Sequence, residues 1–218
     1  MGMTSRWPHD RTGLCLATPV ILLWIGLLSG CEPSSQQDMV GASLGSDGML
    51  VKANRIISAA LSDPDPRIRT NAIEVVASTR QLRFGPAVRR LLRDPVIPVR
   101  FAALLAMGDL QYAVAKADVQ QIFDETREDP NIRLAAAYAL YRLGATPYAD
   151  YARKVITTDN QTVRANAALV LGKTGDTRCL DALYWAIQDN ASDDRVLDQA
   201  LESIAMLGDH RILQKAFA

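Results

Sequence analysis

One apolar residue and one alanine recur through the chain at a nearly constant distance. The apolar residues lie 31, 33, 31 and 33 positions apart, and an alanine follows each of them four residues later. These pairs are Ile68 and Ala72, Val99 and Ala103, Ile132 and Ala136, Val163 and Ala167, and Val196 and Ala200. A period of this length, filled with helix-forming residues, predicts a solenoid in which each helical pair buries its apolar face against its neighbours.

The pattern inside each period predicts where the helices lie. We expect first helices over 66–79, 98–110, 131–143, 161–173 and 194–207, and second helices over 86–93, 114–128, 147–157, 177–189 and 210–217. A helix over 48–62 is expected to cap the N-terminal end of the array. Three glycines, Gly144, Gly175 and Gly208, stand where helix C-terminal caps are expected. The recurring alanine leaves room for close helix packing, and a larger residue there would overpack the seam.

The N-terminus has the organisation of an export signal. Arg6 and Arg11 form a basic region, and an apolar run from Leu14 to Leu28 follows. This run is shorter than the roughly 20 apolar residues that a membrane-spanning helix needs. It ends in the sequence Leu28-Ser29-Gly30-Cys31.

These four residues resemble the lipobox of bacterial lipoproteins. The resemblance implies that residues 1–30 are a lipoprotein signal peptide, that cleavage precedes Cys31, and that acyl chains on Cys31 anchor the protein to a membrane. It places the protein in the bacterial cell envelope, on the periplasmic or cell-surface side. Two acyl chains are enough for stable anchoring, because each buried methylene contributes about 0.8 kcal/mol. An ordinary signal peptide with an incidental cysteine is the alternative, and Glu32 leaves the choice of inner or outer membrane open.

Residues 31–47 separate the predicted anchor from the predicted array. They are rich in Ser, Gln and Gly and have no sustained apolar period, which is typical of a flexible tether. A coil of this length would reach about 20 to 25 Å. With the lipobox resemblance, we expect a signal peptide over 1–30, a lipidated cysteine and tether over 31–47, and an array over 48–218.

The starts of the expected first helices resemble HEAT repeats, especially the short bacterial type first noted in phycobilisome-lyase-like proteins. The resemblance is carried by recurring Asp, apolar, Arg and Ala positions in Asp63-Pro64-Asp65-Pro66-Arg67-Ile68-Arg69 and in the segments that begin at Asp94, Asp129 and Asp159. It covers residues 48–218 and implies an all-α, right-handed superhelical solenoid of about five helical hairpins. The fifth unit departs from the pattern, because Leu197 replaces the arginine.

Four arginines occupy the same position in successive units. The resemblance implies that each of them pairs with loop aspartates or carbonyl groups of an adjoining unit, which makes a structural ladder. The alternative is a row of cations that binds an anionic partner. The ladder consists of Arg69, Arg100, Arg133 and Arg164.

The sequence lacks the patterns that usually indicate catalysis or a bound metal. It contains only two histidines, His9 and His210, and it has no CxxC, HExxH, GxSxG or phosphate-loop motif. The formal net charge is zero, whereas a nucleic-acid-binding protein would show an excess of Lys and Arg. We therefore expect no enzyme activity, no cofactor, no metal and no nucleic-acid partner.

A partner-binding surface is expected on the second helices, which usually line the concave side of HEAT arrays. The register of their apolar residues points four positions outward, namely Arg93, Asp124, Arg153 and Trp185. Trp185 is the only tryptophan outside residues 1–30, and an outward aromatic residue among charged ones is typical of an interaction hot spot. The alternative is that Trp185 packs against the last repeat.

Residues 80–100 contain six arginines and a single acidic residue, Asp94. Such a segment could contact an acidic partner or lipid headgroups. The alternative is pairing with the acidic residues of the helix expected over 114–128.

Together these features predict a membrane-tethered, non-enzymatic scaffold or adaptor that binds a protein in the cell envelope. The alternative is a cofactor-handling or lyase-type enzyme similar to bilin lyases, which rests on the repeat resemblance. Export separates the two, because bilin attachment occurs in the cytoplasm. A third possibility, a nucleic-acid enzyme like the HEAT-fold DNA glycosylases, conflicts with both the charge and the export signal.

Overall fold

The structure is a computed structural model that describes residues 35–211, and the side chains of residues 48–211. The boundary between two compact units falls between Leu44 and Gly45, and the helical array lies in the second unit. The predicted signal peptide, Cys31 and most of the helix predicted over 210–217 lie outside the described residues. None of the described helices is both long and apolar enough to cross a membrane.

Helix α1 runs from Ser35 to Ala60. The structure thus differs from the coil expected over residues 35–47. The physical reason lies in composition, because this segment has no proline and contains the good helix formers Gln, Met, Ala and Leu. Just beyond its C-terminal end, Leu61 is only 3% exposed, and Ile57 and Ala60 pack against the same core. This end of α1 and Leu61 cover the first repeat, as a capping helix would.

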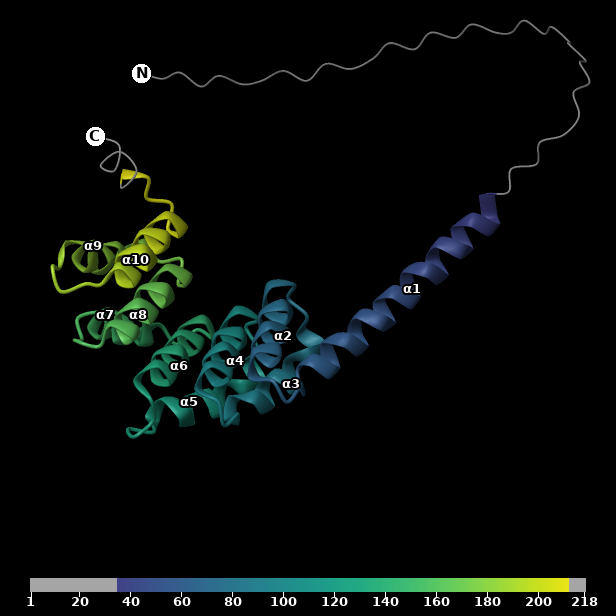
Figure 1. The fold of residues 1–218 in the computed structure, drawn as a ribbon, viewed down its shortest axis with the longest axis horizontal. Coiled ribbons are helices and arrows are strands. Elements are labelled where there is room, and N and C mark those ends of the chain that lie inside the picture. Colours follow the sequence, from purple (N-terminus) through teal and green to yellow (C-terminus); the bar gives the residue numbers. More distant parts are fainter. Residues whose placement is uncertain (1–34, 212–218) are drawn as a thin grey trace, which may run out of the picture. The chain divides into compact units, whose positions relative to one another are not determined.

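The first helices of the units lie side by side in one layer (Figure 1). At the start of four of them the N-cap side chain accepts a hydrogen bond from a first-turn N–H group. These N-cap residues are Asp65, Asp129, Asn160 and Asp193. Proline in the first turn starts three of them. They are α2 (Pro66–Ser78), α4 (Ile97–Asp109), α6 (Pro130–Arg142), α8 (Gln161–Lys173) and α10 (Asp194–Met206). Their bounds match the predicted ranges to within one residue.

The second helices are shorter, and each begins with a turn of 3-10 helix. The first of them also ends in 3-10 geometry. They are η1 (Leu82–Phe84), α3 (Gly85–Arg90) and η2 (Leu91–Arg93); η3 (Ala113–Ala115) and α5 (Lys116–Asp124); η4 (Thr146–Tyr148) and α7 (Ala149–Val155); and η5 (Thr177–Cys179) and α9 (Leu180–Gln188).

The predicted glycine caps end the last three first helices. Gly144, Gly175 and Gly208 have φ angles of 91°, 72° and 77°, in the left-handed region that glycine adopts without steric cost. In the first two units the same position is taken by Arg80 and Gln111, with φ angles of 52° and 50°.

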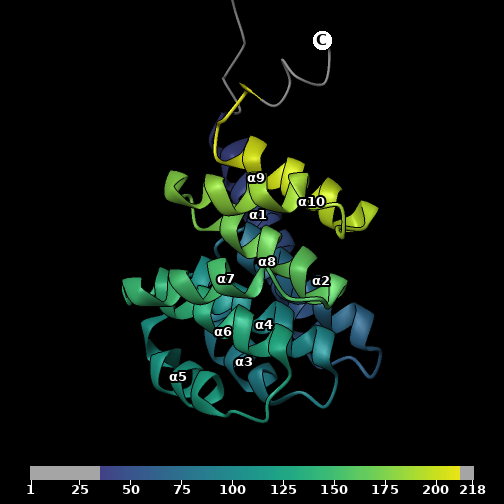
Figure 2. The ribbon, with the colours of Figure 1, turned by 90° about the vertical axis from the view of Figure 1, so that its left-hand side faces the viewer.

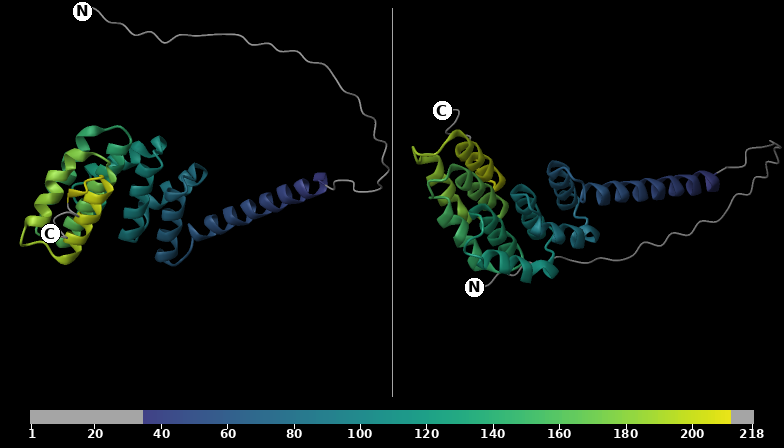
Figure 3. Two further views of the ribbon diagram at one scale, coloured as in Figure 1. Left: turned by 90° about the horizontal axis from the view of Figure 1, so that it is seen from above. Right: turned by 60° about the horizontal axis from the view of Figure 1, so that its bottom comes forward.

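The core runs continuously through the array. One cluster of buried residues extends from Leu61 to Leu140, a second extends from Leu134 to Ile204, and α6 contributes to both. Figure 2 shows the helical pairs stacked in successive layers, and Figure 3 shows the same succession from two other sides. All described elements are helical, so the predicted all-α superhelical solenoid is confirmed.

The first helices approach closely where they cross. A Cβ atom added at Gly172 of α8 would lie 2.6 Å from the Cβ atom and 2.8 Å from the Cα atom of Ser203 on α10. A Cβ atom at Gly108 of α4 would lie 2.9 Å from the ring of Tyr138 on α6. These contacts leave no room for a side chain at either glycine.

Candidate functional site

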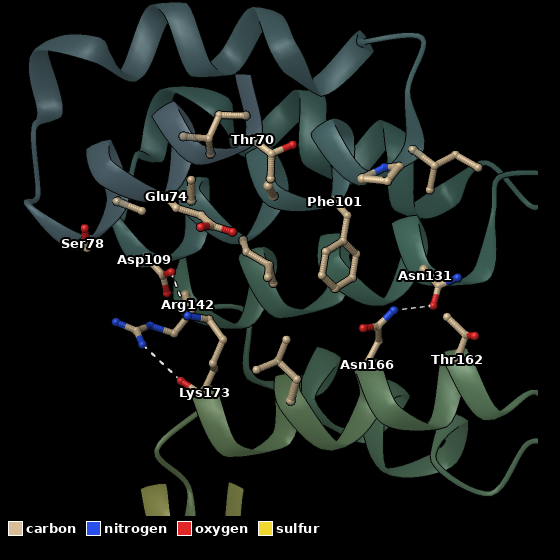
Figure 4. A pocket seen from close by; sticks show the side chains of 18 of the residues that line it. Thr70, Glu74, Ser78, Phe101, Asp109, Asn131, Arg142, Thr162, Asn166 and Lys173 are labelled. Atoms are coloured by element: carbon tan, nitrogen blue, oxygen red, sulfur yellow. Dashed lines mark hydrogen bonds and ion pairs between the residues drawn. The ribbon is translucent and has the colours of Figure 1, made fainter. Parts of the chain in front are cut away.

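A cavity of about 810 Å³ opens on the layer of first helices (Figure 4). Its lining comes from α2, α4, α6 and α8 and from Arg80, which follows α2. The volume falls in the range of about 300 to 1,000 Å³ that is usual for small-molecule sites. The second helices, on which a partner-binding surface is expected, contribute no residue to this cavity.

One wall of the cavity is apolar. Ile97, Phe101 and Leu105 lie four residues apart on α4 and therefore share one face of that helix, and Leu169 of α8 adds to the lining. Figure 4 shows the Phe101 ring between the two polar ends of the cavity. Ile97 is 41% exposed, so part of this wall is open to solvent.

Charged side chains gather at one end of the cavity. The Lys173 ammonium donates a hydrogen bond to Asp109, with 2.9 Å between Nζ and Oδ2. The Arg142 guanidinium donates to the Lys173 carbonyl oxygen and to the Tyr138 hydroxyl, each at 3.4 Å. These residues come from α4, α6 and α8, so their contacts connect three successive repeats.

The buried Tyr138 side chain holds Asp109 in place at the charged end of the cavity. Its side chain is buried, and its hydroxyl donates a hydrogen bond to the Asp109 carboxylate. Burial, followed by the charge of Asp109, raises the pKa of the Tyr138 hydroxyl well above its ordinary value. Tyr138 therefore stays a neutral donor at all ordinary pH values, and it holds Asp109 in place beneath Lys173.

The opposite end of the cavity is polar but uncharged. The Asn166 side-chain amide on α8 donates to Asn131 Oδ1 on α6 at 2.9 Å. Thr162 lies beside this pair (Figure 4). The cavity thus has a charged end, an apolar middle and a neutral polar end.

The four residues expected on a partner-binding surface lie on or beside the second helices, and none lines the large cavity. Arg93 and Asp124 are exposed, and Arg93 borders a smaller cavity of about 370 Å³. Arg153 is half-buried and forms ion pairs with Asp150 and Asp176. The structure holds no partner chain, so partner binding by these residues stays a prediction.

Trp185 is 41% exposed on α9. One face of its indole ring covers the Arg164 guanidinium, with 5.1 Å between the guanidinium carbon and the ring centroid. Arg164 itself is only 2% exposed. Trp185 therefore has an inner face that packs on the arginine and an outer face that is free to make contacts.

The four recurring arginines contact adjoining loops and helices. Arg69 forms two hydrogen bonds of 2.9 Å with the Asp94 carboxylate, and Arg100 binds Glu128 at 3.0 Å. Arg133 donates to the Phe123 carbonyl at 3.1 Å, and Arg164 binds Asp189 at 2.6 Å and Ser192 at 2.9 Å. Asp94, Glu128 and Asp189 all lie in loops that lead into the next unit, so these contacts join consecutive repeats.

The arginine-rich segment 80–100 is partly paired within the array. Arg89 forms an ion pair with Asp118 of α5, and Arg93 donates to Gln121 at 3.2 Å. Within the part of the chain whose side chains are described, no group of three or more His, Cys, Asp or Glu residues is placed to hold a metal ion.

The sequence is similar to a known family and to a protein of a phycocyanin operon. A family model described as HEAT repeats matches residues 53–140 and 150–216. A protein of Pseudanabaena tenuis, described as an uncharacterized phycocyanin operon protein Z, is 26% identical over 161 residues, which cover 71% of this chain and 79% of that protein.

Two solved structures match the chain. The complex of CpcE and CpcF of phycocyanin lyase from Nostoc sp. matches with a TM-score of 0.53 and 19% identity. The match covers 70% of this chain and 65% of the lyase chain, so this chain spans less than two thirds of that protein. Human deoxyhypusine hydroxylase matches with a TM-score of 0.41 and 12% identity over 72% of this chain and 74% of that chain.

These similarities correct the expectation that the protein is not an enzyme. The same helical array occurs in a phycocyanin lyase, and the relative with 26% identity belongs to a phycocyanin operon. The expectation rested on missing catalytic motifs, and those motifs describe hydrolases, metalloproteases and phosphate-binding enzymes. Their absence therefore carries no weight against a lyase.

Proposed function

The chain belongs to the HEAT-repeat family, and from this premise we propose that it is a lyase-type, cofactor-handling protein whose array holds an open-chain tetrapyrrole. The observation that carries the proposal is the cavity on α2, α4, α6 and α8. The similarity to a phycocyanin operon protein supports the choice of ligand class.

The cavity suits a ligand of this class in size and in chemistry. An open-chain tetrapyrrole is elongated and mostly apolar, and it can lie along the wall formed by Ile97, Phe101 and Leu105. Sites for such ligands combine an apolar lining with a few polar groups that fix orientation. In this proposal the described residues bind and orient the tetrapyrrole, and the acceptor protein supplies the group to which it becomes attached.

Ligand binding can be tested with biliverdin as the probe. Titration of the full chain should give a saturable change in the visible absorption of biliverdin. Leu169→Glu should abolish this change, because it places a carboxylate in the apolar wall, where Leu169 is only half-buried. Leu82→Glu is the matched control, because Leu82 is 56% exposed and lies outside the cavity.

Lyase activity needs a second measurement. The chain is mixed with biliverdin or a related bilin and with apo-phycocyanin, and the acceptor is then denatured. Colour that remains on the denatured acceptor indicates a covalent product. Failure of biliverdin to bind, or an equal effect of both leucine substitutions, would contradict the proposal.

As an alternative to bilin attachment in the cytoplasm, we propose that the protein is anchored at a membrane of the cell envelope through Cys31 and binds a protein partner there. The lipobox-like sequence before Cys31 supports the anchor, and the exposed outer face of Trp185 supports a partner surface. Palmitate labelling that disappears in Cys31→Ser would support the anchor, and labelling that persists would refute it. Cell fractionation then decides whether the protein meets its ligand in the cytoplasm or on the exported side.

A further inference from the structure

We propose that Arg142 and Lys173 form a carboxylate-binding subsite at the charged end of the cavity. The subsite would bind an acidic side arm of the ligand and so fix its direction along the array. This inference rests on the proposed binding of a tetrapyrrole in the cavity, and it assigns to two residues the recognition of the ligand's acid groups.

The charges that line the cavity do not balance. Its acidic residues are Glu74 and Asp109, and its basic residues are Arg80, Arg142 and Lys173. Arg142 is half-buried and forms no ion pair with an acidic residue in the part of the chain whose side chains are described. The lining therefore has one excess positive charge, and Arg142 is a half-buried cation at the charged end without a carboxylate partner.

Arg142 and Lys173 retain hydrogen-bonding capacity. Lys173 has three donors, and Asp109 accepts from it. Arg142 has five donors, and its two protein contacts are long, at 3.4 Å each. A planar guanidinium matches the geometry of a carboxylate, which it can bind through two parallel hydrogen bonds. A ligand carboxylate would therefore gain charge-assisted bonds without displacing a strong existing contact.

The Lys173 ammonium is held in place before any ligand arrives. Asp109 binds it at 2.9 Å, and the buried Tyr138 hydroxyl donates to the other oxygen of Asp109. The ammonium also lies 5.6 Å from the centroid of the Tyr138 ring. Tyr138 and Asp109 are thus positioning residues, and a fixed ammonium loses less conformational entropy when a ligand binds.

The cavity is also directional. Figure 4 shows Asp109, Arg142 and Lys173 at one end, the Asn131–Asn166 pair and Thr162 at the other, and Phe101 between them. A ligand whose apolar body covers Phe101 can place a carboxylate on Arg142 and Lys173. The neutral amides at the other end offer no comparable attraction for an anion.

The test compares biliverdin with its dimethyl ester, which has the same body but no acid groups. We expect the full chain to bind the acid about 10- to 100-fold more tightly than the ester, which is the usual contribution of hydrogen bonds between charged groups. Added salt should weaken binding of the acid and leave binding of the ester unchanged, because only the acid contributes a charge.

Substitutions assign the effect to the subsite. Combined Arg142→Gln and Lys173→Gln substitutions should lower the affinity for the acid to that for the ester, and Arg142→Lys should retain part of the preference. Arg90→Gln is the matched control, because Arg90 is exposed on α3 and borders only the smaller cavity. Circular dichroism of each variant checks that the array is folded.

The outcomes separate the two proposals. Equal affinities for acid and ester in the unsubstituted chain would overturn the carboxylate subsite and leave tetrapyrrole binding intact. A preference for the acid that survives the double substitution would place the subsite elsewhere and refute the assignment. Absence of binding by both compounds would overturn the proposed function and this inference together.

Discussion

Replacing Gly172 by alanine should destabilise the array, although alanine is the better helix former. Gly172 lies inside α8, where alanine contributes about 0.8 to 1.0 kcal/mol more than glycine to helix stability. The new Cβ atom, however, would lie 2.6 Å from the Cβ atom and 2.8 Å from the Cα atom of Ser203. A backbone atom cannot rotate out of the way, so α10 would have to move by about 1 Å to restore normal carbon contacts of roughly 3.5 to 4.0 Å.

The size of the effect follows from these opposing contributions. Overpacking of a tight core typically costs about 1 to 3 kcal/mol. After subtraction of the helix-propensity gain, Gly172→Ala should lower the free energy of unfolding by up to about 2 kcal/mol. Gly48→Ala is the matched control, because Gly48 is also inside a helix but its added Cβ atom would meet nothing within 4 Å. That substitution should leave stability unchanged or raise it.

Urea denaturation followed by far-UV circular dichroism measures both variants. Because neighbouring repeats stabilise one another, hydrogen exchange should locate the damage in α10, whose amide groups should lose protection in Gly172→Ala. If Gly172→Ala is as stable as Gly48→Ala, the close crossing of α8 and α10 does not exist in solution and the packing argument is wrong.

Three further predictions concern single side chains. Arg69→Ala should cost about 3 to 5 kcal/mol, because it leaves Asp94, which is 5% exposed, without its cation; Arg195→Ala, at a side chain 68% exposed, should barely change the urea midpoint. Asp189→Asn should lose less thermal stability than the unsubstituted chain when the pH is lowered from neutral to well below about 4, the ordinary aspartate pKa. The Ala191 N–H group and Arg164 lower the pKa of Asp189, so its contribution is present above the unfolded-state pKa and is lost as pH falls through the folded-state value; an unchanged pH profile would contradict this. Trp185→Ala should lower thermal stability by about 2 kcal/mol, because the Trp185 ring covers the buried Arg164 guanidinium, while it weakens capture of a partner from detergent-solubilised membranes. A loss of about 3 to 5 kcal/mol, the usual cost of truncating a buried aromatic residue, would make Trp185 a core residue.

The helix positions were predictable from the sequence because they depend on local chemistry. Proline and the capping residues Asp65, Asp129 and Asn160 mark helix starts, and Gly144 and Gly175 mark helix ends. Each of these signals acts within a few residues, so no knowledge of the fold is needed to use it. The apolar residues at four-residue spacing add the face that packs on the next unit.

The caps at Arg80 and Gln111 were not predictable in the same way. A left-handed conformation costs a residue with a Cβ atom about 1 to 2 kcal/mol relative to its ordinary conformations. An arginine or a glutamine therefore does not predict a helix C-terminal cap. Arg80 and Gln111 each stand two residues after the end of a first helix, the position that glycine takes in the later units, and they adopt the same left-handed conformation. The backbone conformation of these two residues therefore follows from their position in the repeat and not from the preference of their side chains.

The side of the array that carries the cavity was not predicted. A repeat pattern shows which residues pack between units, but it does not show on which side of the array a cavity opens. The sizes of the side chains that pack between units indicate that side. The first helices α4 and α6 meet through alanines, namely Ala102, Ala103 and Ala106 on α4 and Ala135, Ala136 and Ala139 on α6. The second helices of the same two units meet through edge-to-face contacts of Phe123 with Tyr148 and Tyr151, with ring centroids 4.9 and 5.1 Å apart. Layers joined by small residues pack closer than layers joined by aromatic rings, and this difference favours a bend toward the first helices, where the cavity lies. The apolar residues Ile97, Phe101 and Leu105, which share a face of α4 not used by the Val99, Ala103 and Met107 stripe, then line the hollow. The apolar stripe on α4 beyond the one that joins the repeats is therefore the sequence feature that indicates this cavity.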